Sequence, residues 1–140
     1  MTSATYGANV VMGGLLTFSS LFTSTGSGTI QSIAIDFTTA QTVGLKLYPF
    51  NANPSNTTWT EHSAASINSA DIFKVEPYIS ISNADSGLGT MTNYSLSGIG
   101  QAYSTGGTSG YFILVPTATT ATTGGTTNVV QVCVTVLQDS

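Results

Sequence analysis

The chain has 140 residues, a length at which one domain with a single hydrophobic core is expected. Charged residues make up only 6% of it, while 24 Thr, 18 Ser and 15 Gly dominate, a composition that disfavours helices and favours strands. The formal net charge is −4 and the only cations besides His are Lys46 and Lys74, which excludes nucleic acid and anionic membranes as partners because both need clustered positive charge.

The first strand-like run is the apolar segment 9–18, which Gly13 and Gly14 interrupt. A Ser- and Gly-rich stretch follows it. We therefore expect residues 1–28 to form an N-terminal arm, or a first strand with a linker, in front of a sandwich domain over 29–140.

Two runs with clear alternation come next. Residues 29–37 place Ile33, Ile35 and Phe37 on one face, and residues 43–48 repeat the pattern. The period of two predicts strands, and the short polar segment between them is compatible with a hairpin loop.

The second half of the chain adds further runs. Residues 73–81 alternate, with Phe73 predicted to face inward and Pro77 indicating an edge strand or a bulge. Residues 90–96 form a weaker run, and residues 111–115 are apolar on both faces, which predicts a strand buried on both sides.

The last run, residues 129–137, carries valines at alternate positions and the lone cysteine, Cys133. Free cysteines are among the most buried residues, so we predict that Cys133 lies in the core. No sustained 3.6-residue period occurs, so at most a helical turn is expected, at 63–66 or 68–71. The predicted fold is all-β, an antiparallel β-sandwich with a jelly-roll-like arrangement.

The sequence offers little for catalysis. His62 is the only histidine, no serine sits in a Gly-x-Ser-x-Gly elbow, and six scattered carboxylates do not define an acid–base pair. A metal site needs several ligands, and the glycine pairs do not lie between a strand and a helix as a phosphate loop requires. We therefore expect a binding protein without enzymatic activity, metal or cofactor.

Two sets of residues are candidate contacts. Aromatic residues near strand ends are candidates for exposed contacts, either stacking on sugars or, as we favour, plugging the sandwich or lying at a protein interface: Tyr48, Phe50, Trp59 and Tyr78. An uncharged apolar segment either packs on its own sandwich or forms an assembly interface with a neighbour: Val10, Val11, Met12, Leu15, Leu16, Phe18, Leu21 and Phe22.

One stretch resembles a known group of proteins. Residues 47–54 end in Phe-Asn-Ala-Asn-Pro, residues 57–61 read Thr-Thr-Trp-Thr-Glu, and Ala-Asp follows at 70–71. This order, and the later Tyr-Ser-Leu-Ser-Gly-Ile-Gly at 94–100, resembles small proteins of tailed bacteriophages and prophages encoded near the head genes. The resemblance covers about residues 29–100.

The resemblance implies a virion structural protein, namely a head decoration or cement protein with a β-sandwich body. Such a protein would be made in the host cytoplasm and would sit on the capsid exterior. Its partners would be the phage major capsid protein and itself, with a homotrimer as the favoured oligomer. The alternative from another class is a lectin-like or receptor-binding module displayed on the virion or tail.

Overall fold

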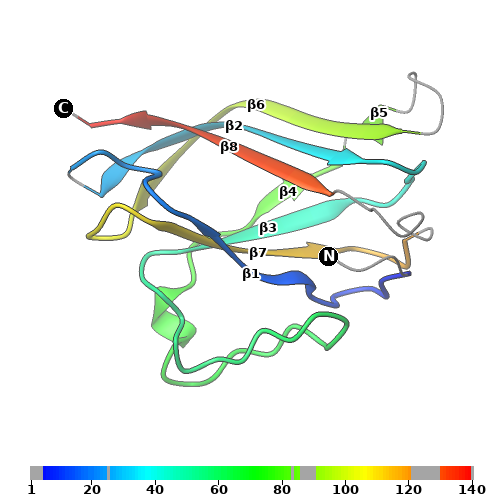
Figure 1. Cartoon of the computed structure of the whole chain (residues 1–140), viewed down its shortest axis with the longest axis horizontal. Coiled ribbons are helices and arrows are strands. Elements are labelled where there is room, and N and C mark those ends of the chain that lie inside the picture. The colour runs from blue at the N-terminus through cyan, green and yellow to red at the C-terminus, as the bar shows by residue number, and fades with distance from the viewer. Residues whose placement is uncertain (1–4, 25, 83, 86–90, 121–129, 140) are drawn as a thin grey trace.

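The protein is a sandwich of two four-stranded antiparallel sheets (Figure 1). The computed structural model describes residues 5–24, 26–82, 84–85, 91–120 and 130–139. The strands are β1 (Met12–Phe18), β2 (Ser27–Phe37), β3 (Leu45–Phe50), β4 (Ile79–Ile81), β5 (Ala84–Asp85), β6 (Thr92–Ser104), β7 (Gly110–Pro116) and β8 (Gln131–Gln138). A single 3-10 turn, η1 (Ile72–Lys74), is the helical element of the described part.

Sheet 1 has the strand order β1-β7-β3-β4 and sheet 2 the order β5-β6-β2-β8. The all-β sandwich predicted from composition and alternation is confirmed, whereas the jelly-roll arrangement stays a prediction. The hairpin expected across residues 38–42 is wrong, because β2 and β3 belong to different sheets. Both edges of β2 are occupied, one by β6 and the other by β8, so β3 pairs in the other sheet.

The main core lies between the sheets. Each central strand turns alternate apolar side chains inward, as Ile33 and Ile35 of β2 and Leu45 and Leu47 of β3 do. Buried aromatic residues fill the ends of this layer: Tyr6, Phe22, Phe37, Tyr94, Tyr103 and Phe112. Residues 112–115 of β7 are buried on both faces, as predicted, because a second apolar cluster covers the outer face of sheet 1.

Tyr103 joins the two sheets through the core. Its ring comes from β6, and its hydroxyl donates to Phe50 O of β3 at 3.1 Å and accepts the Tyr111 N–H of β7 at 2.9 Å. Burial raises the pKa of Tyr103 to about 12. At the other end of β6, the Tyr94 hydroxyl donates to Val43 O, two residues before β3, at 2.6 Å. Burial raises the pKa of Tyr94 to about 12.

The N-terminal segment forms the edge strand of sheet 1. Gly13 and Gly14 both have φ of 76°, and the register of β1 with β7 shifts between Met12 and Leu16. The two glycines therefore make a bulge rather than ending the strand. Within the segment predicted as an arm or first strand, residues 12–18 form the strand β1, and Ser27 and Gly28 already belong to β2.

Two expectations are wrong. Residues 73–81 are not one strand: Phe73 lies in η1 with 90% of its surface exposed. Residues 79–81 form the short strand β4 beside β3, and Val75 makes an isolated bridge with Phe50 of β3. Cys133 is exposed rather than buried, because Val132 and Val134 take the inward positions of β8 and alternation turns Cys133 to the outer face. Val129 and Thr90, at the ends of two predicted runs, lie outside the described residues.

Candidate functional site

A long loop, residues 51–78, covers the outer face of sheet 1 and is seen below the sandwich in Figure 1. Its apolar residues Trp59, Ile67 and Val75 pack against outward-facing side chains of sheet 1. Those strand residues are Val11, Leu15, Tyr48, Phe50, Tyr111, Ile113 and Val115. We call this segment the covering loop, because it gives the protein a third layer.

Asp71 organises the covering loop from within. Its side chain is fully buried and accepts hydrogen bonds from the Asn56 N–H at 2.9 Å, the Thr57 hydroxyl at 2.8 Å and the Lys74 ammonium at 2.7 Å. Burial acts to raise the pKa of Asp71, but these donors and the Lys74 charge outweigh it and hold the pKa well below its usual range. Lys74 also donates to Asn53 O at 2.8 Å. The Lys74 ammonium therefore links the start of the covering loop, at Asn53, to the segment around Asp71.

Main-chain bonds fasten the covering loop to the sandwich at two places. Near β3, the Asn51 N–H donates to Lys74 O at 2.8 Å and the Glu76 N–H donates to Pro49 O at 2.9 Å. Near β1, the Val11 N–H donates to Ser63 O at 2.9 Å. The loop is therefore held at its base and along its far side.

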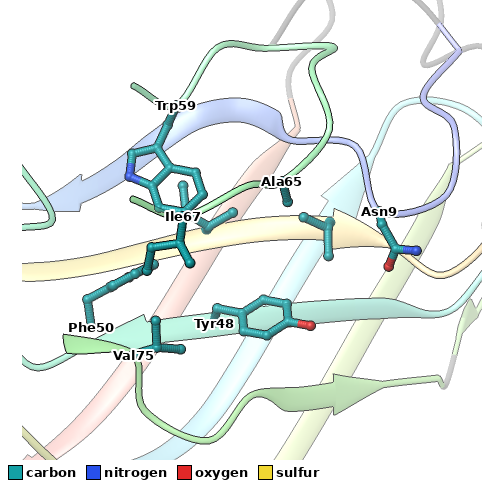
Figure 2. Close-up of a pocket in the computed structure, with 9 residues that line it drawn as sticks. Asn9, Tyr48, Phe50, Trp59, Ala65, Ile67 and Val75 are labelled. Atoms are coloured by element: carbon teal, nitrogen blue, oxygen red, sulfur yellow. The ribbon is translucent and has the colours of Figure 1, made fainter. Parts of the chain in front are cut away.

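An apolar cleft of about 260 Å³ opens between the covering loop and sheet 1 (Figure 2). Strand residues form its floor and loop residues its walls. The lining residues are Asn9, Tyr48, Phe50, Trp59, Ala65, Ile67, Val75, Ile113 and Val115. None of these side chains is a carboxylate, a histidine or an amine. The Asn9 amide and the Tyr48 hydroxyl supply its polar groups. Such a cleft is suited to bind an apolar group and has no acid–base chemistry of its own.

The covering loop also carries exposed apolar side chains. In η1, Ile72 is 51% exposed and Phe73 90% exposed, and Tyr78 at the end of the loop is 50% exposed. The Lys46 ammonium lies 5.0 Å from the centre of the Tyr78 ring, a cation–π contact. We call Ile72, Phe73 and Tyr78 the apolar rim.

The four candidate aromatics gather on this face as two pairs. The rings of Tyr48 and Tyr78 lie 5.3 Å apart, and those of Phe50 and Trp59 5.5 Å apart. Phe50 is buried and is therefore not an exposed contact. Trp59 in the wall of the cleft and Tyr48 in its floor are half-buried, which leaves Tyr78 as the exposed ring of the four.

The candidate assembly segment packs largely on its own sandwich. Val11, Met12 and Phe22 are buried, and the remaining members are partly buried against the two apolar clusters: Val10, Leu15, Leu16, Phe18 and Leu21. The sequence pattern did not identify the apolar rim, because alternation assigned Phe73 to the core.

His62, the lone histidine, lies beside Tyr6 and Glu61. It lies at a loop position with φ of 66°, and its ring stacks on Tyr6 at 4.3 Å, while the Tyr6 hydroxyl donates to Glu61 Oε1. Within the described ranges, no group of three or more His, Cys, Asp or Glu side chains is arranged to hold a metal ion. The described residues also include no helix with the length and apolar character to cross a membrane.

The chain matches no protein-family model, no curated protein and no solved structure. Its function is therefore inferred from the fold and from the geometry of the covering loop.

Proposed function

We propose that the protein is a non-catalytic virion structural protein, a head decoration protein that binds the outer surface of a phage major capsid lattice and stabilises the head. The observation that carries the proposal is the apolar rim on a rigidly held loop. Large exposed apolar side chains on a soluble protein mark interaction sites, and buried aromatic anchors dominate protein interfaces.

Three features of the molecule support permanent binding. The covering loop is fixed by the Asp71 network, so ordering it on a partner costs little conformational entropy. The apolar cleft contains Tyr48, whose ring lies 5.3 Å from that of Tyr78 in the rim, and it can receive an apolar side chain of the partner. The surface carries few charges, so its burial demands little ion desolvation. The sequence resemblance adds the class of partner, a major capsid protein.

The proposal places the capsid contact on the covering loop rather than on the N-terminal segment. Capsids assembled without the protein from the major capsid protein of the same genome are the test. Cosedimentation with purified protein should show saturable binding, and bound capsids should resist heating better than bare ones. The Phe73→Ser variant should bind at least about 30-fold more weakly, the loss of a central aromatic anchor.

Met91→Ser is the matched control, since Met91 is 47% exposed and lies outside the covering loop. It should bind as the unchanged protein does. Equal binding by Phe73→Ser would remove the covering loop from the interface, and no binding by the unchanged protein would refute capsid decoration. A glycan array tests the lectin-like alternative, which requires sugar binding that is lost in Tyr78→Ala.

A further inference from the structure

Three of the four sheet edges carry features that discourage pairing with another strand. β4 has three residues and β5 has two, and β1 bulges at Gly13 and Gly14. Native proteins use short strands and bulges in this way to prevent edge-to-edge association. β8 differs from these three: it runs for eight residues, Gln-Val-Cys-Val-Thr-Val-Leu-Gln, without a proline, a glycine or a charge.

The outer side of β8 presents a row of main-chain groups. The Asp139 N–H donates to Ser27 O of β2 at 3.3 Å. Alternation then turns the N–H and C=O groups of Val132, Val134 and Val136 away from β2. In the part of the chain that the structure describes, β8 pairs with β2 and with no second strand.

An open groove of about 220 Å³ lies at the start of this edge. It lies between β1 and β8 and is lined by Gly13, Leu16, Thr17, Phe18, Val130 and Val132. A strand added beside β8 would turn every second side chain toward the inner face of sheet 2, on which this groove opens at one end. The inward side chains of β8 itself are valines, which are apolar and suited to strands.

We infer that β8 is a pairing edge for β8 of a second copy of this chain, joined antiparallel about a twofold axis. Sheet 2 of one copy and sheet 2 of the other, four strands each, would then form one continuous eight-stranded sheet. The same chain is the fitting occupant because a twofold antiparallel pair is self-complementary and because β8 has no charge to oppose its own copy. The inference does not depend on capsid decoration.

The geometry fixes a register. A twofold axis at the middle of the exposed row sets Val134 opposite its own copy as a hydrogen-bonded pair, and Cys133 opposite Thr135. The two Cys133 side chains then lie on the same outer face as diagonal neighbours, about 7–8 Å apart between Cα atoms. Cys133 is exposed, so it can report on the pairing without alteration of the chain.

Cross-linking with a short-spacer bismaleimide tests the inference. Each chain has one cysteine, so a covalent dimer on a denaturing gel reports two Cys133 side chains within reach. The matched control is the double variant Cys133→Ser/Ser97→Cys. Ser97 is exposed on β6, two strands from the edge, so its copies would be five strand spacings apart, about 24 Å.

The unchanged protein should give a dimer that is diluted away with decreasing concentration, and the control should give little. Thr135→Lys, on the exposed face of β8, should reduce the dimer yield by about tenfold, since edge lysines oppose pairing. Ser95→Lys, equally exposed on β6 and with the same added charge, should leave the yield unchanged. Gln131→Lys replaces Thr135→Lys if that variant does not fold by circular dichroism. Equal dimer yields from the unchanged protein and the double variant, or from the two lysine variants, would overturn the inference.

Discussion

Tyr103→Phe isolates the bridge between the two sheets, because it removes one hydroxyl and leaves the ring in place. The ring keeps its contacts with Phe22 and Phe112, whose centres lie 5.8 and 5.2 Å away. The hydroxyl serves the main chain of Phe50 and Tyr111. Its loss deprives a buried acceptor and a buried donor of this partner, which costs about 1–3 kcal/mol. At about 2 kcal/mol the expected fall in Tm is about 6 °C.

Urea denaturation followed by circular dichroism measures the free energy of unfolding, and Tyr94→Phe is the comparison. Tyr94 loses one hydrogen bond, to Val43 O, so its variant should be destabilised less than Tyr103→Phe. If Tyr103→Phe is as stable as the unchanged protein, water or another group satisfies Phe50 and Tyr111, and the bridge does not stabilise the sandwich.

The pH dependence of stability above about pH 10 tests the burial of Tyr103 in a second way. The pKa of Tyr103 in the fold is about 12, above the usual value of about 10, so the fold favours the neutral phenol. The resulting stabilisation is present below about pH 10 and is lost as the pH rises through about 12. Tyr103→Phe should therefore lose less stability than the unchanged protein between about pH 10 and 12, and an identical alkaline slope would contradict the assignment.

Three further predictions concern other parts of the chain. Asp71→Asn should lower the Tm at about pH 7 and reduce the fall of the Tm with decreasing pH. A lowered carboxyl pKa gives stability that is present above about pH 4 and lost as the pH falls below it. The same fall of the Tm with pH in both proteins would contradict this. Cys133 should react with a bulky maleimide nearly as fast in the native protein as in denaturant, and protection in dilute protein would show that it is covered. In urea titrations, Gly26→Ala should destabilise the protein by more than about 2 kcal/mol and Gly98→Ala by about 1 kcal/mol. Both glycines have positive φ, but only at Gly26 would a Cβ lie 2.4 Å from a backbone atom, Gly107 O. Equal losses would show that the backbone at Gly107 moves aside.

The conformation of the covering loop could not be predicted from the periodicity of the sequence. Residues 73–81 alternate as a strand does, yet η1 interrupts them because Asp71 accepts hydrogen bonds from Asn56 and Thr57, and these fold the chain back. Hydrogen bonds between residues fifteen apart leave no periodic signal. The exposure of Phe73, on which the proposed binding face depends, follows from that network.

The sequence by itself determined the class of the fold. Abundant Thr, the period of two in residues 29–37 and the doubly apolar residues 111–115 predict strands, because each depends on neighbours along one strand. Tertiary structure alone decided which strands share a sheet, and thus that Cys133 faces outward and that β8 is an edge. A side chain's burial depends on the layer packed against its face, and that layer comes from residues distant in the chain.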